Sequence, residues 1–68
     1  MDFMAILNEL REAVDKDGRT RIAIATAAKI HETTFSAFMS GKRGLSVETT
    51  ESLAKALGFS LKLVKDRH

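Results

Sequence analysis

The chain has 68 residues, of which 44% are hydrophobic and 29% charged, and its formal net charge is +2. Such a length predicts one domain, residues 1–68, with a small core that needs helix packing, oligomerisation or both. The lack of cysteine excludes disulfides and thiolate metal sites, and two histidines alone cannot hold zinc, so no cofactor is expected. With no signal peptide and no apolar run of about 20 residues, we expect a cytoplasmic protein without a membrane partner.

The charged residues are unevenly distributed along the chain. Residues 2–17 hold five acidic side chains against Arg11 and Lys16, whereas residues 18–45 hold five basic side chains against Glu32 alone. A basic segment of this kind suits an anionic polymer as partner. An ordinary solvated surface would have the same composition and is the alternative.

Four helices are predicted in chain order, at about residues 3–14, 20–28, 32–39 and 47–57. Asp2 is the expected N-cap of the first helix, and Gly18 can take the left-handed conformation after it. Thr20 caps the second helix, whose predicted buried side consists of Ile22, Ile24, Ala25 and Ala28. Ile30, in the break that follows, is expected to point into the core.

The third predicted helix has two different sides. Phe35, Phe38 and Met39 recur at helical spacing and form an apolar rear, while the front carries small polar residues. Gly41 ends this helix, and Ser46 caps the fourth, which ends at Gly58.

The end of the chain changes period. From residue 59 to 65 apolar residues alternate with others, which predicts a short strand. Because the chain holds no other strand candidate, this strand is expected to pair with its own copy in a second subunit, with Phe59, Leu61 and Leu63 in the dimer interface. The alternative is an extended tail that packs Leu61 and Leu63 onto the helices.

Residues 20–46 also meet the requirements of a helix-turn-helix. Such a motif needs a short link, small residues where its helices cross, and a second helix with an apolar rear and a short polar front. Ala25 allows the close crossing, and Ile30 and Phe35 fix the angle.

Residues 20–58 resemble the lambda-repressor and Cro (XRE-like) type of helix-turn-helix domain. The residues that carry the resemblance are Ala25, the Phe35/Phe38 pair and the run SGKRGLS at 40–46, which leads into Ser-Val-Glu-Thr and a helix ending Ala-Leu-Gly. The resemblance implies an all-α fold, a bundle of four to five helices with a helix-turn-helix. The C-terminal strand at 59–65 would be added to this bundle.

The resemblance also implies roles in binding double-stranded DNA. The implied base-contacting residues are Glu32, Thr33, Thr34, Ser36 and Ala37. The implied phosphate-contacting residues are Arg21, Lys29, His31, Ser40, Lys42 and Arg43. Two positions depart from the family. Lys29 stands where glycine is usual, which costs about 1 kcal/mol if the left-handed conformation is kept. Glu32 stands where glutamine is commoner; a carboxylate accepts from cytosine N4 but repels phosphate.

The leading hypothesis is a sequence-specific DNA-binding protein without enzymatic activity. It would be a small prokaryotic or phage transcriptional repressor, associated with the nucleoid and acting as a homodimer on a palindromic operator. One alternative is an antitoxin-like module that binds its operator and a toxin-like partner protein. Another is a protein-interaction domain that has lost DNA binding, which Glu32 favours.

Overall fold

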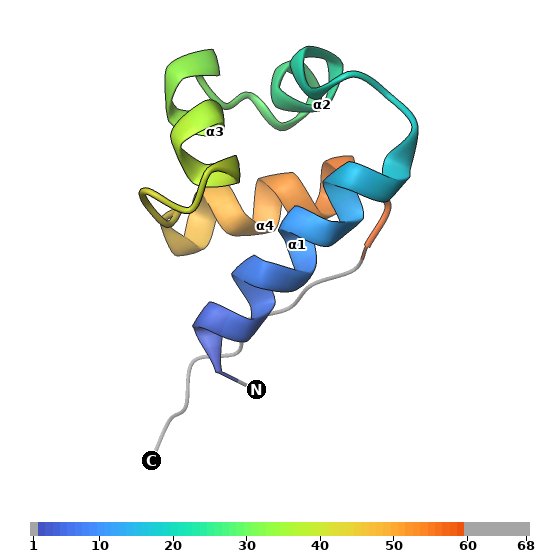
Figure 1. Ribbon diagram of the computed structural model, residues 1–68. Helices are drawn as coiled ribbons and strands as arrows, with labels where there is room; N and C mark the ends of the chain where they lie inside the picture. The colour runs from blue at the N-terminus through green and yellow to red at the C-terminus, as the bar shows by residue number, and fades with distance from the viewer. Residues whose placement is uncertain (1, 60–68) are drawn as a thin grey trace.

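The computed structural model describes residues 2–59 and contains four α-helices (Figure 1). They are α1 (Phe3–Asp17), α2 (Arg21–Ala28), α3 (Glu32–Met39) and α4 (Val47–Ala56). The prediction of four helices in this order is confirmed, and residues 2–59 contain no strand. The predicted strand, with Leu61 and Leu63, lies outside the described residues apart from Phe59, which is 54% exposed.

Two details of the predicted helices were wrong. α1 continues to Asp17 rather than ending at Val14, because charged residues on an exposed last turn do not interrupt a helix and the left-handed Gly18, with φ 93°, does. Ile22 is 62% exposed rather than buried. At 100° per residue it lies 200° from the buried Ile24, on the opposite side of α2.

The helices pack around one core. α2 packs against α3 and α4, and α1 packs against α4, so that α2 and α3 lie together above the crossing of α1 and α4 in Figure 1. Among residues 2–59, no helix combines the length and apolar character needed to cross a membrane. The buried apolar residues are Leu7, Leu10, Val14, Ile24, Ala25, Ala28, Ile30, Phe35, Phe38, Leu45, Leu53 and Ala54.

The turn between α2 and α3 is closed by a Schellman motif. The Lys29 N–H donates to the Thr26 carbonyl oxygen at 3.1 Å, and the Ile30 N–H donates to that of Ala25 at 2.9 Å. Lys29 has φ 60° and ψ 39°, so the left-handed conformation is kept here without glycine. The cost falls on one exposed residue, while the next residue, Ile30, enters the core.

Replacing Lys29 by glycine should therefore raise the free energy of unfolding by about 0.5–1 kcal/mol, measured by urea denaturation. Glycine removes the clash of Cβ with the backbone, and its greater freedom in the unfolded chain offsets part of the gain. Lys29→Ala is the matched control, since it removes the charge but keeps Cβ. An equal gain in both variants would assign the effect to charge rather than to the backbone.

Arg19 connects the ends of α1 and α4. Its Nε donates to Asp17 Oδ1 at 2.6 Å, and its Nη2 donates to the Ala56 carbonyl oxygen at 2.8 Å. The hydrogen bond from Arg19 lowers the pKa of Asp17 below its ordinary value of 3.8. Both the carboxylate and the guanidinium are thereby held at the end of the bundle opposite the loop after α3.

A carboxyl group with a lowered pKa stabilises the fold fully above its ordinary pKa, and the stabilisation is lost as the pH falls through the lowered pKa. The free energy of unfolding should thus fall as Asp17 is protonated below pH of about 3.8, and Asp17→Asn should reduce that slope. The effect should be small and weakened by salt because the pair lies at the surface. Asp15→Asn, which leaves the Arg19 contacts intact, is the control in acid titrations followed by circular dichroism. An equal change of slope in both variants would contradict the assignment to Asp17.

Candidate nucleic-acid interface

α3 presents one side to the core and the other to solvent. Phe35 and Phe38 are 3% and 0% exposed, with ring centroids 6.2 Å apart. The front residues Glu32, Thr33 and Ser36 are exposed. Burial of the aromatic rear therefore fixes which side chains of this helix face outward.

His31 begins α3 as its N-cap. Its Nδ1 accepts a hydrogen bond from the Thr33 N–H at 3.4 Å, which satisfies one of the free donors of the first turn. Glu32 follows in that turn, where the helix dipole favours a negative charge. The cap leaves the Thr33 side chain free to face outward.

An open depression runs along the front of α3. Four residues with an implied role in base contact line it: Glu32, Thr33, Ser36 and Ala37. Three residues with an implied role in phosphate contact line it as well: His31, Ser40 and Lys42. The structure thus brings seven of the predicted site residues to one concave surface, where short side chains let another molecule approach the helix closely.

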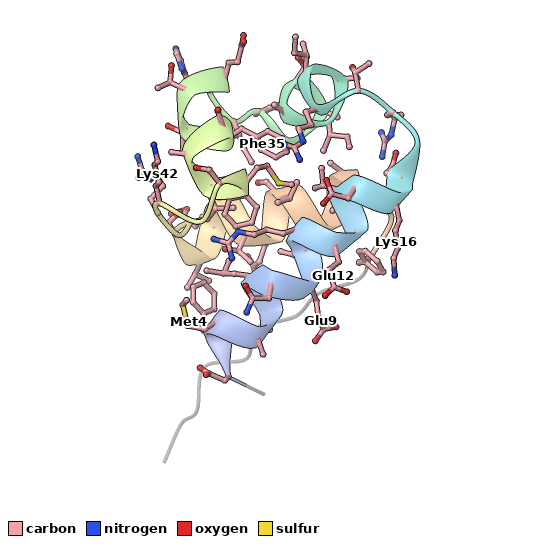
Figure 2. The ribbon with its side chains drawn as sticks, in the orientation of Figure 1. Met4, Glu9, Glu12, Lys16, Phe35 and Lys42 are labelled. Carbon is pink, nitrogen blue, oxygen red and sulfur yellow. The ribbon has the colours of Figure 1, made fainter. Side chains whose placement is uncertain are left out.

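The loop after α3 is fixed at its start by a second Schellman motif. The Gly41 N–H donates to the Phe38 carbonyl oxygen at 3.0 Å, and the Lys42 N–H donates to that of Ala37 at 2.9 Å. Gly41 supplies the positive φ, 81°, that this motif requires. Figure 2 shows Lys42 beside the last turn of α3, and both Lys42 and Arg43 are exposed.

Arg11 of α1 anchors this loop, and sequence reasoning did not assign it a role. Its Nε donates to the Phe38 carbonyl oxygen at 2.6 Å, and its Nη2 donates to that of Arg43 at 3.3 Å. Its guanidinium also lies 4.4 Å from the centre of the Phe38 ring. The partners are 27 and 32 residues away in the chain, so no local sequence signal identifies the contact.

The remaining predicted site residues lie around the depression rather than in it. Thr34 is half-buried, and Lys29 is exposed on the turn. Arg21 lines a neighbouring depression between α2 and α3 together with Glu32 and Ser36. Its guanidinium is 3.0 Å from Asp15 Oδ1, and about 60% of each side chain is exposed, so this ion pair is weak and leaves Arg21 available to another anion.

Exposed Ile22 lines the same neighbouring depression, and sequence reasoning placed it in the core instead. The helical periodicity of the short α2 segment contains the signal that could have corrected this, because Ile22 and Ile24 cannot share a side. Ile22 adds apolar surface next to the polar front of α3.

A family model described as a helix-turn-helix domain matches residues 5–66. The match covers both helices, the turn and the loop that surround the depression. It agrees with the resemblance to lambda-repressor-like domains. The chain matches none of the curated proteins and none of the solved structures with which it was compared.

Replacing Arg11 by methionine should lower the free energy of unfolding by about 2 kcal/mol, because two carbonyl oxygens lose a charged donor. Methionine keeps an apolar side chain against the Phe38 ring, so the loss reports the hydrogen bonds together with the contact between the guanidinium and the ring. Urea denaturation measures it, and Lys16→Met on the exposed side of α1 is the control. Equal stability of the two variants would show that Arg11 does not anchor the loop.

Proposed function

Because the chain belongs to the helix-turn-helix domain family, we propose that it binds double-stranded DNA with α3 in the major groove. One observation carries this proposal: the depression along α3 combines short polar side chains with Lys42 at its edge. Short side chains allow close approach to base edges, and flanking donors hold the phosphates. Such a surface belongs to a binding module rather than an enzyme.

The front of α3 would read the bases. Thr33 and Ser36 offer hydroxyl groups to base edges, and Ala37 offers a methyl group that can contact a thymine methyl. Glu32 accepts from cytosine N4, and Thr34, being half-buried, would assist from the side.

The residues around α3 would hold the phosphates. Lys42 and Arg43 on the loop supply cations at one end of the helix, and Arg21 and Lys29 supply them from α2 and the turn. His31 would donate from Nε2, and the Ser40 hydroxyl would exchange its hydrogen bond to the Ala37 carbonyl oxygen, 3.1 Å long, for one to a phosphate. Contacts of this kind give affinity that falls steeply with salt concentration.

Two copies of the chain would bind as a homodimer. Two α3 helices on one face of the duplex would read half-sites about 34 Å apart, so that the operator is palindromic. Occupying such an operator would repress transcription. Phe59, Leu61 and Leu63 would lie in the dimer interface, and Phe59 is exposed as an interface residue must be in one copy.

A protein-interaction role is the second candidate, in which a toxin-like or other partner protein would occupy this surface. Glu32 favours it, because its carboxylate is exposed and no cation within residues 2–59 lies in ion-pair distance of it. Selection of bound duplexes from a random pool separates the two candidates. A palindromic consensus supports the repressor, whereas failure to bind duplex even at low salt supports the protein partner.

The two groups of residues should respond differently to substitution. Lys42→Ala or Arg43→Ala should weaken binding to every duplex alike and reduce the salt slope by about one unit each. Thr33→Ala should cost about 1 kcal/mol of discrimination at one base pair and leave the salt slope unchanged. Fluorescence anisotropy on matched and mismatched duplexes at several salt concentrations measures both quantities.

Lys55→Ala is the control for the loss of one positive charge, because Lys55 is exposed in the last turn of α4, next to Ala56, whose carbonyl oxygen Arg19 binds. This control should change neither the salt slope nor the discrimination between base pairs appreciably. If Lys42→Ala and Thr33→Ala altered specificity to the same extent, the division into phosphate and base contacts would be wrong.

A further inference from the structure

A groove between α1 and the end of α4 takes no part in the proposed contact with DNA. Its volume is about 350 Å³, and its apolar surface comes from Ala13, Leu57 and Phe59. Its charged surface comes from Glu9, Glu12 and Asp17, with Lys16 as the one basic residue of its lining. Figure 2 shows Glu9 and Glu12 on the opposite side of the view from Lys42, so an occupant of this groove would leave the front of α3 free.

Two acidic residues of the groove form no ion pair with a described residue, and the acidic side chains of its lining outnumber Lys16 by three to one. Asp17 is bound by Arg19, but Glu9 and Glu12 are exposed and have no ion-pair partner within residues 2–59. They are three residues apart on α1 and therefore neighbours on one side of the helix. Next to them Phe59 exposes 54% of its surface. An occupant should thus combine basic and apolar side chains.

The chain itself contains a segment of that chemistry, which begins where the described residues end. Residues 60–68, SLKLVKDRH, carry Leu61 and Leu63 together with Lys62 and Lys65. We propose that this groove binds residues 60–68 of a second copy of the chain. The inference rests on the proposed homodimer and deepens it by naming the surface that receives each copy's C-terminal segment.

The two copies would exchange their C-terminal segments, which gives the dimer two-fold symmetry. Each copy offers one groove and one segment, so the same contact forms twice in the dimer. Nine residues extend to about 30 Å at most, which limits how far apart the two grooves can lie. The apolar residues supply burial, and the pairing of lysines with Glu9 and Glu12 sets which surface is chosen and makes the dimer sensitive to salt.

Charge reversal with rescue tests the contact. The first variant carries Glu9→Lys and Glu12→Lys, the second Lys62→Glu and Lys65→Glu, and the third all four substitutions. Sedimentation equilibrium without DNA should show that each pair weakens dimerisation at least about tenfold, since it places like charges opposite each other. The third variant has the net charge of the natural chain and should recover dimerisation to within about threefold of it.

The proposal is overturned if the natural chain stays monomeric, if the first variant dimerises normally, or if the third shows no recovery. It is also overturned if substitution of Lys62 and Lys65 shifts the Glu9 and Glu12 resonances of a monomer, since the chain's own segment would then fill the groove. Circular dichroism checks that each variant is folded.

The outcome is separate from that of DNA binding. Fluorescence anisotropy with a random duplex at low salt reports the proposed DNA contacts of α2, the turn, α3 and its loop, and none of the residues of the groove. A chain that binds no duplex but follows the dimerisation pattern above would refute the proposed function and uphold this interface. A chain that binds duplex without following that pattern would support the proposed DNA binding and refute this interface.

Discussion

The position of α3 depends on the burial of Phe38 and on the contacts that Arg11 makes with its ring and its carbonyl oxygen. Phe38 is fully buried, and the Arg11 guanidinium lies over its ring while donating to its carbonyl oxygen. The same guanidinium donates to the carbonyl oxygen of Arg43, so one side chain of α1 sets both the end of α3 and the following loop. The Schellman motif at Gly41 fixes the start of the same loop from within the chain segment itself. The outward-facing front of α3 follows from the aromatic burial, and the cations at its edge are held by the Schellman motif and by Arg11 together.

The sequence predicted the elements better than the contacts between them. Capping residues and glycines identified most of the helix boundaries, because a residue such as Ser46 or Gly41 ends or begins a helix through contacts with residues next to it in the chain. The apolar rear of α3 was predicted from the helical spacing of Phe35, Phe38 and Met39, which is also a local signal. Arg11 and Arg19 could not be placed, since each donates to a carbonyl oxygen more than 25 residues away, and the identity of a residue does not reveal such a partner. Arg19 in particular counts among the basic residues of the segment 18–45, yet its charge is held by Asp17 at the far end of the bundle.

The charges differ between two sides of the molecule, to which the two proposals above assign different partners. The loop after α3 carries Lys42 and Arg43, while the exposed side of α1 carries Glu9 and Glu12. Separation of this kind keeps the acidic residues out of the phosphate field, where they would oppose binding. Under the proposed dimer, the same carboxylates on α1 would bind a basic segment rather than DNA. The uneven distribution of charge along the sequence therefore becomes an uneven distribution over the folded surface.

Glu32 is the exception to this division, and the fold supplies a reason for it. It lies in the first turn of α3, where the helix dipole favours a carboxylate by about 0.3–1 kcal/mol. The residue therefore stabilises the helix whether or not DNA is present. Near a duplex the same carboxylate repels phosphate and gains only where a cytosine N4 donor meets it. Under the proposed function, Glu32 lowers the affinity for most DNA sequences and restores it only where a cytosine lies opposite. The difference in affinity between the operator and other DNA therefore increases. An acid at this position is thus compatible with specific binding, at the expense of non-specific binding.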